Sequence, residues 1–389
     1  MRIGLVLPSP PAYSETFFTN KIKGLEAHGH TVVVFVNNSK KGTFNTTKCK
    51  VAPKLSGSLL TVGSISIFTL VYSLVFHFNK SKRLFLLDRE DGLGVIQRIK
   101  NVIGNSHIIA EPLDWLHFGF GTMVFNRENV AKAIGAKMAV SFRGFDIGVY
   151  PLKNPGCYLR LWDKVNKIHV ISNDIRALLY THGYNGKAEI IKITPAIDTF
   201  YFKKEDCQLP SVKNSFITVA RLHWKKGLEY TLEAFALLKK EGIDFHYTII
   251  GEGEEYERLK FAVYQLDLLD YITFTGKIKH EKIKDELNNS NIYIQYSIQE
   301  GFCNAVLEAQ AMGKLCIVSD AEGLSENILD NETGWVVPKY APNMLAERIQ
   351  KVIELDSEHK KRIAHNAQRR VREKFNIENQ QKKFVDFYT

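Results

Sequence analysis

The sequence contains no closely spaced pair of cysteines. Its five cysteines are odd in number and scattered along 389 residues, without any C-x-x-C motif. This distribution is typical of reduced thiols in a cytoplasm and argues against a disulfide framework or a structural zinc site. The first ten residues, MRIGLVLPSP, also lack the long apolar core of a signal peptide, so we expect a cytoplasmic protein.

Three motifs that hold metals, phosphates or dinucleotides are missing as well. No D-x-D sequence occurs, so we expect no bound metal and no requirement for a divalent cation. There is no G-x-x-x-x-G-K-[ST] loop, and the first apolar strand is not followed by G-x-G-x-x-G. These absences argue against a nucleoside triphosphatase and a dehydrogenase, and we expect no cofactor.

The charge of the chain suits three classes of partner. The formal net charge is +10 at pH 7, which fits nucleic acid, an anionic membrane or anionic small molecules. No block of Lys and Arg and no RNA-binding signature accompanies this charge, so we expect no nucleic-acid partner. The length predicts two or three domains, and an apolar fraction of 45% is ordinary for soluble globular proteins.

The first half of the chain alternates between apolar strands and a helical pattern. Ile3 to Leu7 is an unbroken apolar run followed by three prolines, which is typical of a buried strand in a parallel sheet. A helical pattern closed by Gly29 comes next, and then a second apolar run from Thr31 to Val36. This βαβ order predicts a doubly wound sheet, with further strands at 107–110, 137–142 and 167–171.

The same alternation starts again after residue 214. We expect strands at 216–220, 246–250, 272–275, 292–295 and 315–319, with helices at 228–240, 254–266, 282–288 and 304–312. The two series predict an α/β protein with two Rossmann-like parallel-sheet domains that face an inter-domain cleft. The predicted division is an N-terminal domain at 1–200, a C-terminal domain at 201–375, and a last helix at 376–389 that packs back on the N-terminal domain.

Residues 55–78 interrupt this pattern. The segment LSGSLLTVGSISIFTLVYSLVFHF contains no Lys, Arg, Asp or Glu and is long enough to span a bilayer. A span would place two parts of one sheet on opposite sides of a membrane, which the βαβ order disfavours. A buried core helix and a membrane-docking helix are the alternatives. We favour docking to an anionic membrane surface, because the basic stretch at 79–83 follows the segment.

Two cations follow the strand at 216–220 in the second half. Arg221 leaves the carboxyl end of this strand, and Lys226 precedes Gly227 at a helix start. Ligands of open α/β sheets bind outside the carboxyl ends of the strands, so both cations suit a diphosphate. The alternative is two surface cations near a turn. Gly251 and Glu252 mark a similar tight turn, which by itself is weak evidence of a site.

Two carboxylates flank the start of another predicted helix. In EGFCNAVLE, Glu300 lies on the loop and Glu308 lies inside the helix that begins near residues 302–304. The free N–H groups of a first helical turn attract phosphate, so a phosphorylated ligand over this helix start would lie near both carboxylates. The alternative is a solvated helix start whose acidic residues favour the helix dipole.

The ordered motifs of the second half resemble a known family. RLHWKKG, GEGEEYERL, TFTGKI, QEGFCNAVLEAQAMG, VSDAEGLSENI and NETGWVV follow one another across most of residues 216–350. This series resembles the C-terminal half of the retaining glycosyltransferases of family 4. The resemblance implies the GT-B architecture and a nucleotide-sugar donor, which is a substrate and not a cofactor.

The resemblance also implies roles for individual residues of the donor site. Arg221 and Lys226 match the cationic pair that holds the donor diphosphate. Glu300 matches the first glutamate of an E-x7-E motif, which contacts the donor sugar, and Glu308 matches the second, which binds the ribose. The remaining donor-binding residues that we predict are Gly251, Glu252, Gly301, Phe302, Cys303 and Asn304, of which 301–303 would present backbone N–H groups to phosphate and sugar.

The N-terminal half resembles family members that build exopolysaccharides such as colanic acid and amylovoran. Ser14, Glu15 and Thr16 would line the cleft. DWLHFGFG retains one histidine of a family segment, His117, and SFRGFDI retains Gly144 and Asp146. Arg143 of this segment stands where many relatives have a histidine. An arginine stays charged and cannot act as a base, so at the catalytic position Arg143 would either stabilise the developing pyrophosphate charge or hold an acceptor phosphate.

The sequence therefore predicts a retaining hexosyltransferase of cell-surface polysaccharide biosynthesis. We expect a UDP-sugar donor and a glycan or polyprenyl-linked acceptor, with the protein in the cytoplasm or peripheral on the inner face of the cytoplasmic membrane. The alternatives are a non-catalytic GT-B subunit that binds nucleotide or scaffolds an assembly, and a GT-B transferase or epimerase that acts on a soluble substrate. The sequence does not identify the sugar, the base or the linkage.

Overall fold

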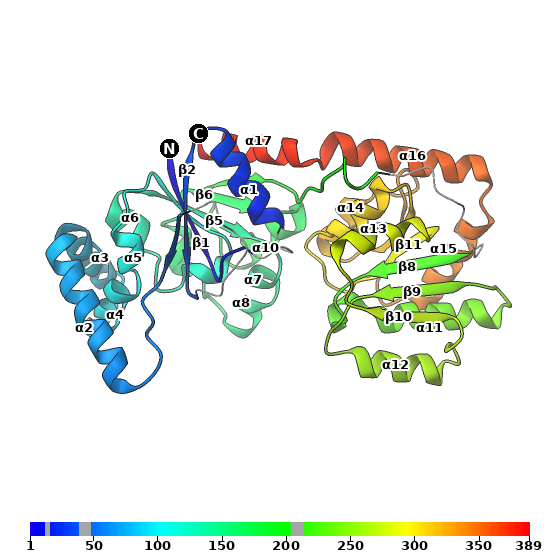
Figure 1. Cartoon of the computed structure of the whole chain (residues 1–389), viewed down its shortest axis with the longest axis horizontal. Coiled ribbons are helices and arrows are strands. Elements are labelled where there is room, and N and C mark those ends of the chain that lie inside the picture. The colour runs from blue at the N-terminus through cyan, green and yellow to red at the C-terminus, as the bar shows by residue number, and fades with distance from the viewer. Residues whose placement is uncertain (12–15, 39–47, 204–213) are drawn as a thin grey trace. The chain divides into compact units, whose positions relative to one another are not determined.

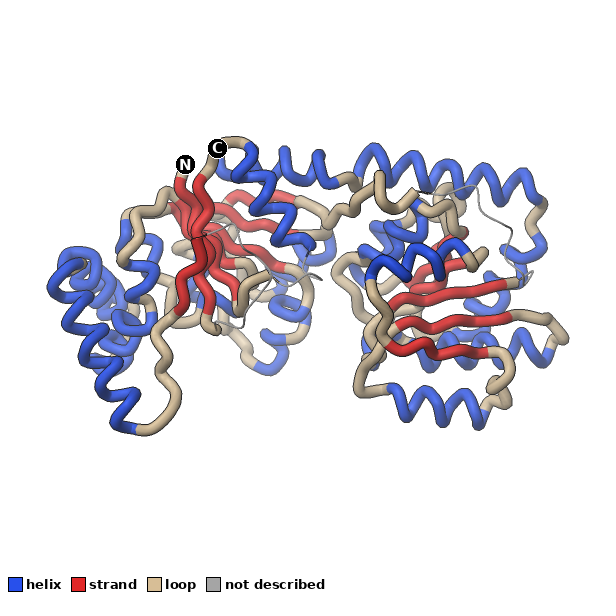
Figure 2. Tube along the Cα trace, in the orientation of Figure 1, coloured by secondary structure: helices blue, strands red, loops and turns tan. Residues whose placement is uncertain are grey.

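Parallel strands form two separate sheets in the computed structural model of the chain, which describes residues 1–11, 16–38, 48–203 and 214–389 (Figure 1). The chain divides into unit 1, Met1–Ile193 with Gln381–Thr389, and unit 2, Thr194–Gln380. The sequence analysis placed the domain boundaries after residues 200 and 375. Helices cover the sheet in each unit (Figure 2). The predicted α/β class with two Rossmann-like sheets is confirmed.

Unit 1 is built on a seven-stranded sheet with the order β3-β2-β1-β4-β5-β6-β7. Its strands are β1 (Arg2–Leu7), β2 (Thr31–Val36), β3 (Lys48–Val51), β4 (Trp115–Phe118), β5 (Lys137–Phe142), β6 (Lys167–Val170) and β7 (Glu189–Lys192). Its helices are α1 (Thr16–Ala27), α2 (Leu59–Phe76), α3 (Phe78–Glu90), α4 (Val95–Gly104), α5 (Ser106–Ile109), η1 (Gly121–Val124), α6 (Val130–Ile134), α7 (Phe145–Gly148), α8 (Tyr150–Lys153), α9 (Leu159–Trp162) and α10 (Asn173–Thr181).

The strand predicted at 107–110 is wrong, because these residues belong to the short helix α5 and its end. Ile108 and Ile109 are fully buried, and a short buried apolar run does not distinguish a strand from a helix. The strand that follows β1 in the sheet is β4, whose residues Trp115 to Phe118 pair with β1.

The last helix, α17 (Ile377–Tyr388), ends in the core of unit 1. Phe384, Phe387 and Tyr388 are fully buried there, among apolar residues of α1 and the sheet. The Trp115 indole N–H donates to the Tyr388 carbonyl at 3.1 Å. The final nine residues therefore complete the core of a unit whose other residues all precede position 194.

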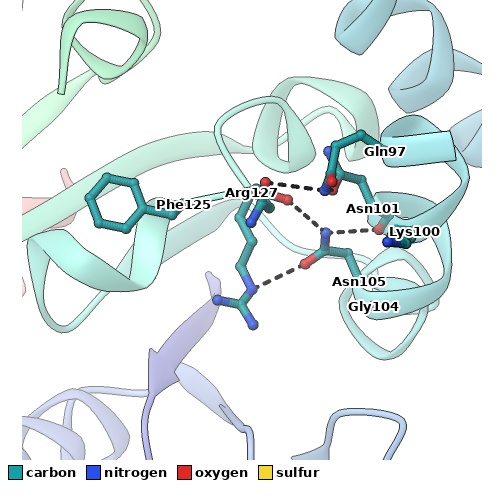
Figure 3. A pocket seen from close by; sticks show the side chains of 8 residues that line it. Gln97, Lys100, Asn101, Gly104, Asn105, Phe125 and Arg127 are labelled. Atoms are coloured by element: carbon teal, nitrogen blue, oxygen red, sulfur yellow. Dashed lines mark hydrogen bonds between the residues drawn. The ribbon is translucent and has the colours of Figure 1, made fainter. Parts of the chain in front are cut away.

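A pocket of about 310 Å³ opens beside α4 in unit 1 (Figure 3). Arg127 Nε donates to Asn105 Oδ1 at 3.1 Å, and Asn105 Nδ2 donates to the Asn126 carbonyl at 3.0 Å. These contacts connect α4 to the segment that follows η1. No residue that the sequence predicts for a site lines this pocket, whose walls are Gln97, Lys100, Asn101, Gly104, Asn105, Phe125, Asn126 and Arg127.

Unit 2 is built on a six-stranded parallel sheet with the order β10-β9-β8-β11-β12-β13. Its strands are β8 (Ser215–Val219), β9 (His246–Ile250), β10 (Ile272–Gly276), β11 (Ile292–Gln295), β12 (Leu315–Ser319) and β13 (Trp335–Val337). Its helices are η2 (Trp224–Lys226), α11 (Leu228–Lys240), α12 (Tyr256–Gln265), α13 (His280–Asn288), α14 (Asn304–Ala311), η3 (Glu322–Asn327), α15 (Pro342–Glu354) and α16 (Ser357–Lys374).

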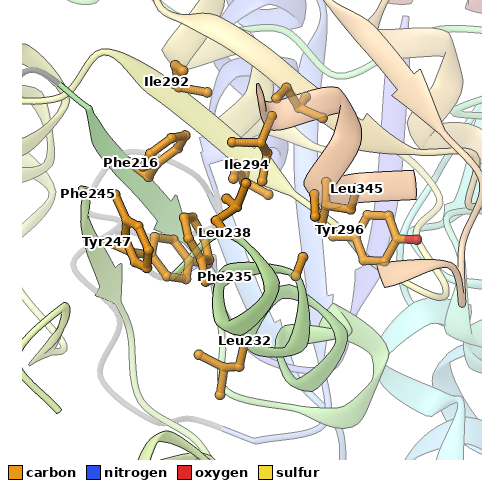
Figure 4. Packing of buried hydrophobic residues seen from close by; sticks show 14 of the residues in the cluster. Phe216, Leu232, Phe235, Leu238, Phe245, Tyr247, Ile292, Ile294, Tyr296 and Leu345 are labelled. Carbon is orange, nitrogen blue, oxygen red and sulfur yellow. The ribbon is translucent and has the colours of Figure 1, made fainter. Parts of the chain in front are cut away.

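An aromatic cluster forms one side of the core of unit 2 (Figure 4). The rings of Phe235 and Tyr247 stack with their centroids 4.5 Å apart, and Phe216 meets Phe235 edge to face at 5.0 Å. Such ring pairs add about 0.5–1.5 kcal/mol to the hydrophobic gain of burial. This packing holds α11 against β8 and β9, so the loops that leave these strands start from rigid elements.

Candidate functional site

Most of the predicted donor residues lie in the loops and turns at the carboxyl edge of the sheet in unit 2, and Asn304 and Glu308 lie in α14. The chain runs outward from β8 to β9 and β10, then returns to place β11 on the other side of β8. Ile292 of β11 pairs with Phe216 of β8 in parallel register. The strand order thus changes direction between β8 and β11, and open α/β sheets bind ligands at such a switch point.

Two loops meet at this switch point. The turn η2 follows β8, and the loop at 296–303 follows β11. The Lys225 carbonyl accepts from the Ile298 N–H at 2.8 Å and from the Gln299 N–H at 3.3 Å. Gly227 permits this close approach, because a Cβ at that position would lie 2.2 Å from the Tyr296 carbonyl oxygen. Residues from two distant parts of the sequence are therefore held side by side.

Lys226 and Glu300 form an ion pair across these loops. The Lys226 ammonium donates to Glu300 Oε2, and the two side chains are only 20% and 17% exposed. Burial by itself lowers the pKa of Lys226, but the Glu300 carboxylate outweighs it, so the pKa of Lys226 is raised. Lys226 is therefore a charged group in a partly desolvated position, where its field acts strongly on a bound anion.

The backbone of Glu300 is held by the first two residues of η3. Its N–H donates to Glu322 Oε2 at 2.9 Å, and its carbonyl accepts from the Gly323 N–H at 3.0 Å. The Lys339 ammonium lies 3.1 Å from Glu322 Oε1. Glu322 has a backbone φ of 27°, a value that few residues other than glycine adopt, so the surrounding contacts enforce its conformation.

The segment before α14 differs from the prediction at one backbone group. Cys303 N–H donates to Asn327 Oδ1 at 3.1 Å, and Asn327 Nδ2 donates to the Cys303 carbonyl at 2.9 Å. Cys303 N–H therefore already has an acceptor within the protein, and its predicted role as a phosphate donor is not available in this conformation. Burial raises the pKa of the Cys303 thiol to about 12, so this thiol is unreactive at neutral pH.

The neighbours of Cys303 divide between core and surface. The Phe302 ring is buried and lies 5.6 Å from the ring of Phe375, so Phe302 offers only its backbone to a ligand. Gly301 and Asn304 are half-buried, and Asn304 is the first residue of α14.

Glu308 lies one turn inside α14 and has a partner from α13. His280 Nε2 is 3.5 Å from Glu308 Oε1. The hydrogen bond to Glu308 raises the pKa of His280, although burial opposes this shift. The imidazole of His280 also lies parallel to the Tyr201 ring, with centroids 6.3 Å apart. A ligand that hydrogen-bonds to Glu308 must therefore share this carboxylate with His280.

Arg221 and Glu252 lie toward the surface. Arg221 is exposed in the loop between β8 and η2. Glu252 pairs with Lys277 at 3.2 Å, and these side chains are 66% and 73% exposed. The Glu252 carbonyl accepts from the Leu222 N–H at 3.0 Å, so the two loops contact each other through their backbones.

This backbone contact leads to a prediction at Gly251. A Cβ at Gly251 would lie 1.8 Å from the Ala220 carbonyl oxygen, and its φ of 146° is strained for other residues. We expect Gly251→Ala to cost at least about 2 kcal/mol more than Gly276→Ala, because Gly276 also has positive φ but has open space around its Cβ position. Urea unfolding of both variants measures the difference. Equal midpoints would contradict this account.

The part of the chain that carries these residues is similar to a known family. Residues 201–370 match the family model "Glycosyl transferases group 1". This part of the chain is therefore similar to the group 1 glycosyltransferases. All the donor-site residues described above lie within it.

Full-length relatives extend the comparison. AmsK of Erwinia amylovora, an amylovoran biosynthesis glycosyltransferase, is 29% identical over 63% of this chain and 62% of its own length. WcaL of Escherichia coli K12, assigned to colanic acid biosynthesis as a glycosyltransferase, is 26% identical over 67% of this chain and 66% of its own. The chain thus matches slightly less than two thirds of the length of either relative.

Solved structures share the fold along nearly the whole chain. Sucrose-phosphate synthase from Thermosynechococcus elongatus covers 100% of this chain and 98% of its own, with a TM-score of 0.77 and 16% identity. HepE from Anabaena in complex with UDP-glucose covers 99% of this chain and 98% of its own, with a TM-score of 0.72 and 15% identity. The fold is GT-B, as the resemblance implied.

Three charged residues near Lys226 and Glu300 were not predicted from the sequence. Lys225 precedes Lys226, and burial lowers its pKa while the nearby Glu300 carboxylate opposes that shift. Glu322 and Lys339 fix the loop that carries Glu300. The adjacent lysines of the W-K-K-G motif were a signal for Lys225. Nothing in the sequence pattern pointed to Glu322 or Lys339, because their role depends on contacts between distant loops.

Of the residues predicted in the N-terminal half, Arg143, Gly144 and Asp146 share one loop of unit 1, next to the start of α1. Ser14 and Glu15 lie outside the described residues, and the backbone of Thr16 begins α1. The Arg143 guanidinium lies over the Phe17 ring, 3.8 Å from its centroid. Asp146 is buried and accepts N–H groups of Arg143, Gly144 and Gly121 at 2.9–3.0 Å. In this conformation Asp146 shapes the loop that carries Arg143.

His117 lies inside unit 1 and does not line a surface, which corrects its predicted place. It is fully buried on β4, 2.6 Å from the Tyr388 hydroxyl and 3.1 Å from the Lys21 ammonium. Burial holds the pKa of His117 well below its usual value, and Lys21 lowers it further. His117 is therefore neutral, and it links β4 to the C-terminal helix and α1.

The His280 and Glu308 pair predicts a response of the domain to pH and nucleotide. The folded-state pKa of His280 is raised above its unfolded value of about 6.5. The pair therefore stabilises the domain fully below that pH, and its contribution is lost as pH rises through the folded pKa. If Glu308 binds ribose, nucleoside diphosphate will draw this carboxylate away, and the pKa of His280 will fall.

Proton NMR titration of His280 checks both effects, with His280→Gln used to assign its signal. Glu308→Gln should lower the pKa of His280, whereas Glu281→Gln should change it less because Glu281 contributes the weaker charge effect. A pKa of His280 that UDP does not move would contradict the proposed use of Glu308.

Proposed function

We propose that this protein is a retaining hexosyltransferase of family 4, which moves a sugar from a nucleotide diphosphate sugar to a glycan acceptor in polysaccharide biosynthesis. The observation that carries the proposal is the Lys226 and Glu300 pair at the switch point of the sheet in unit 2. The match of residues 201–370 to group 1 glycosyltransferases supports it.

The proposed chemistry is charge stabilisation of a leaving diphosphate. Lys226 and Arg221 bind the diphosphate, and the start of α14 adds its dipole. Glu300 accepts hydrogen bonds from sugar hydroxyls. The bond from the anomeric carbon to the β-phosphate oxygen breaks, the acceptor oxygen bonds to that carbon on the same face, and the acceptor proton passes to the β-phosphate oxygen.

In this scheme the Lys226 ammonium interacts first with Glu300 and then also with the donor diphosphate. Without donor, its ammonium is paired with Glu300. When a diphosphate arrives, Lys226 gains a second anion, and Glu300 can turn one carboxylate oxygen to the sugar. The scheme assigns no side-chain base, in keeping with the predicted charged role of Arg143.

We further propose a UDP-sugar as donor and a polyprenyl-linked glycan as acceptor, used by a cytoplasmic protein at the inner face of the membrane. HepE, which shares the fold, was solved with UDP-glucose, and this supports a UDP-sugar. WcaL and AmsK are assigned to exopolysaccharide biosynthesis, which supports a glycan acceptor. The donor sugar and the linkage are open.

Turnover of a panel of UDP- and GDP-sugars by the purified full chain tests the function. We expect hydrolysis or transfer with a UDP-sugar, unchanged by EDTA because no divalent cation is required. A nucleotide that raises the melting temperature identifies the donor base, since it binds only the folded state. Nucleotide binding without turnover across the panel, or activity lost with EDTA, would overturn the catalytic or the metal-independent part of the proposal.

A further inference from the structure

Helix α2 presents an unusual apolar surface on unit 1. In the described part of the chain it is the one helix long and apolar enough to cross a membrane. Only Ser73 of its residues is buried. The core-helix alternative is therefore wrong for this conformation, because α2 packs on α3, α4 and α5 by one side only (Figure 1).

The exposed side of α2 is apolar along its length. Residues 62, 66, 69 and 73 recur at helical spacing and are half-buried or buried, so they form the inner side. The outer side carries five large apolar side chains that are 54–85% exposed: Leu60, Ile67, Phe68, Val71 and Val75. Isolated exposed hydrophobic residues are common, but a continuous stripe marks an interaction surface.

The one polar residue on this outer side is satisfied within the helix. Ser64 Oγ donates to the Leu60 carbonyl. This hydrogen bond lowers the cost of placing the hydroxyl in an apolar medium. The outer side of α2 can therefore lose its contact with water without leaving Ser64 unsatisfied.

Cations gather in the same part of the chain. Residues 48–103 contain nine Lys and Arg against three Asp and Glu, which is most of the excess positive charge of the whole chain. Lys82 and Arg83 are exposed on α3, just after the exposed Phe76 and Phe78. An apolar stripe with flanking cations matches a bilayer whose headgroups are anionic.

The sheet excludes a single crossing of the bilayer by α2. β3 precedes α2 and β4 follows it, and both belong to one continuous parallel sheet. A helix that crossed the bilayer would need a second crossing to return the chain to this sheet. No other helix of the described residues is long and apolar enough for that return.

We propose that α2 lies in the plane of an anionic bilayer, with the side formed by Leu60, Ile67, Phe68, Val71 and Val75 among the lipid chains and Lys82 and Arg83 at the headgroups. This inference sharpens the proposed membrane location but does not depend on sugar transfer. The positive charges of Lys82 and Arg83 favour lipid as the partner of this surface over a second copy of the chain, because two copies would bring like charges together.

Sedimentation of the full chain with vesicles tests this proposal. Vesicles of phosphatidylcholine with phosphatidylglycerol should bind the protein, and pure phosphatidylcholine should bind it much less. Ile67→Ser with Phe68→Ser should weaken binding on the order of 100-fold, since large apolar side chains leave the lipid. Lys82→Gln with Arg83→Gln should weaken it roughly 30-fold at low salt, and the loss should shrink as salt increases.

Matched pairs elsewhere in the chain serve as controls. Phe261→Ser with Tyr264→Ser changes two exposed rings on α12, and Lys361→Gln with Arg362→Gln removes two adjacent exposed cations on α16. Neither should change vesicle binding. Lys80 is left in place because its ammonium holds the carbonyls of Ile109 and Glu111 at 3.2–3.3 Å.

Two outcomes overturn the proposal. In one, the α2 variants bind vesicles as tightly as the wild type. In the other, the wild type does not bind vesicles, but sedimentation velocity shows self-association that Ile67→Ser with Phe68→Ser abolishes, which makes a second copy the occupant. Donor hydrolysis by the same variants should be unchanged, so a failure of the proposed activity is distinguishable from a failure of docking.

Discussion

Lys226→Ala is expected to lower kcat/KM for sugar transfer by about 10²–10³-fold, because one preorganised charge at a developing anion contributes this much. The structure supports a large effect, since Lys226 is mostly buried and its charge is stabilised by Glu300. Steady-state rates at several donor concentrations check the result. A fall in kcat, with a smaller rise in KM, would indicate that Lys226 acts mainly on the leaving group.

The Lys226→Ala experiment needs two controls, one for the removal of any lysine charge and one for unfolding of the protein. Lys239→Ala removes another lysine of unit 2 that pairs with a carboxylate, that of Asp267, and neither residue is predicted for the donor site. It should change kcat/KM less than about twofold. Melting temperatures without ligand then report whether Lys226→Ala has unfolded the protein. A folded Lys226→Ala variant with wild-type kcat/KM would remove Lys226 from the mechanism.

Phe384→Ala is expected to destabilise unit 1 by about 3–5 kcal/mol, which is the usual cost of removing a buried phenylalanine ring. The ring is fully buried, 5.5 Å from Phe17 and 5.1 Å from His169, and the Lys21 ammonium lies 4.4 Å from its centroid. The change therefore leaves a cavity and also removes a partner of a buried cation.

Hydrogen exchange followed by mass spectrometry measures this effect in each unit separately. Amides in the strands of unit 1 should exchange faster by at least about 100-fold, whereas strands of unit 2 should be unaffected. Phe261→Ala offers a control, because its ring is exposed on α12 and its removal should change stability by less than about 0.5 kcal/mol. Unchanged exchange in unit 1 would show that the C-terminal helix does not support its core.

Local patterns were sufficient for most of the strands. The strands predicted at Thr31 to Val36, Lys137 to Phe142 and 292–295 have those same bounds in the structure. Each is an apolar run that a parallel sheet buries on both faces, so its signal lies within the run itself. The predicted helix 228–240 is confirmed for the same local reason. Strands β3, β4, β7 and β13 and helices α15 and α16 were among the elements not predicted.

The wrong predictions concern contacts between residues that are far apart in the sequence, which a short stretch of sequence does not reveal. Residues 107–110 are apolar and buried, but they form the end of a helical layer and not a strand. His117 resembles a site residue in sequence, yet β4 turns its side chain into the core toward Tyr388, 271 positions away. Cys303 N–H lies at a helix start, but an asparagine from another loop binds it.

The sequence by itself determined the two α/β series, the GT-B resemblance and the list of charged residues near the strand ends, because each depends on neighbouring residues. Only the tertiary structure decided how those charges pair and which side of α2 is exposed. Lys226 and Glu300 are 74 positions apart, and their contact depends on two loops meeting at the switch between β8 and β11. The sequence of α2 shows that the helix is apolar, but only its packing in the folded chain shows whether other elements bury it.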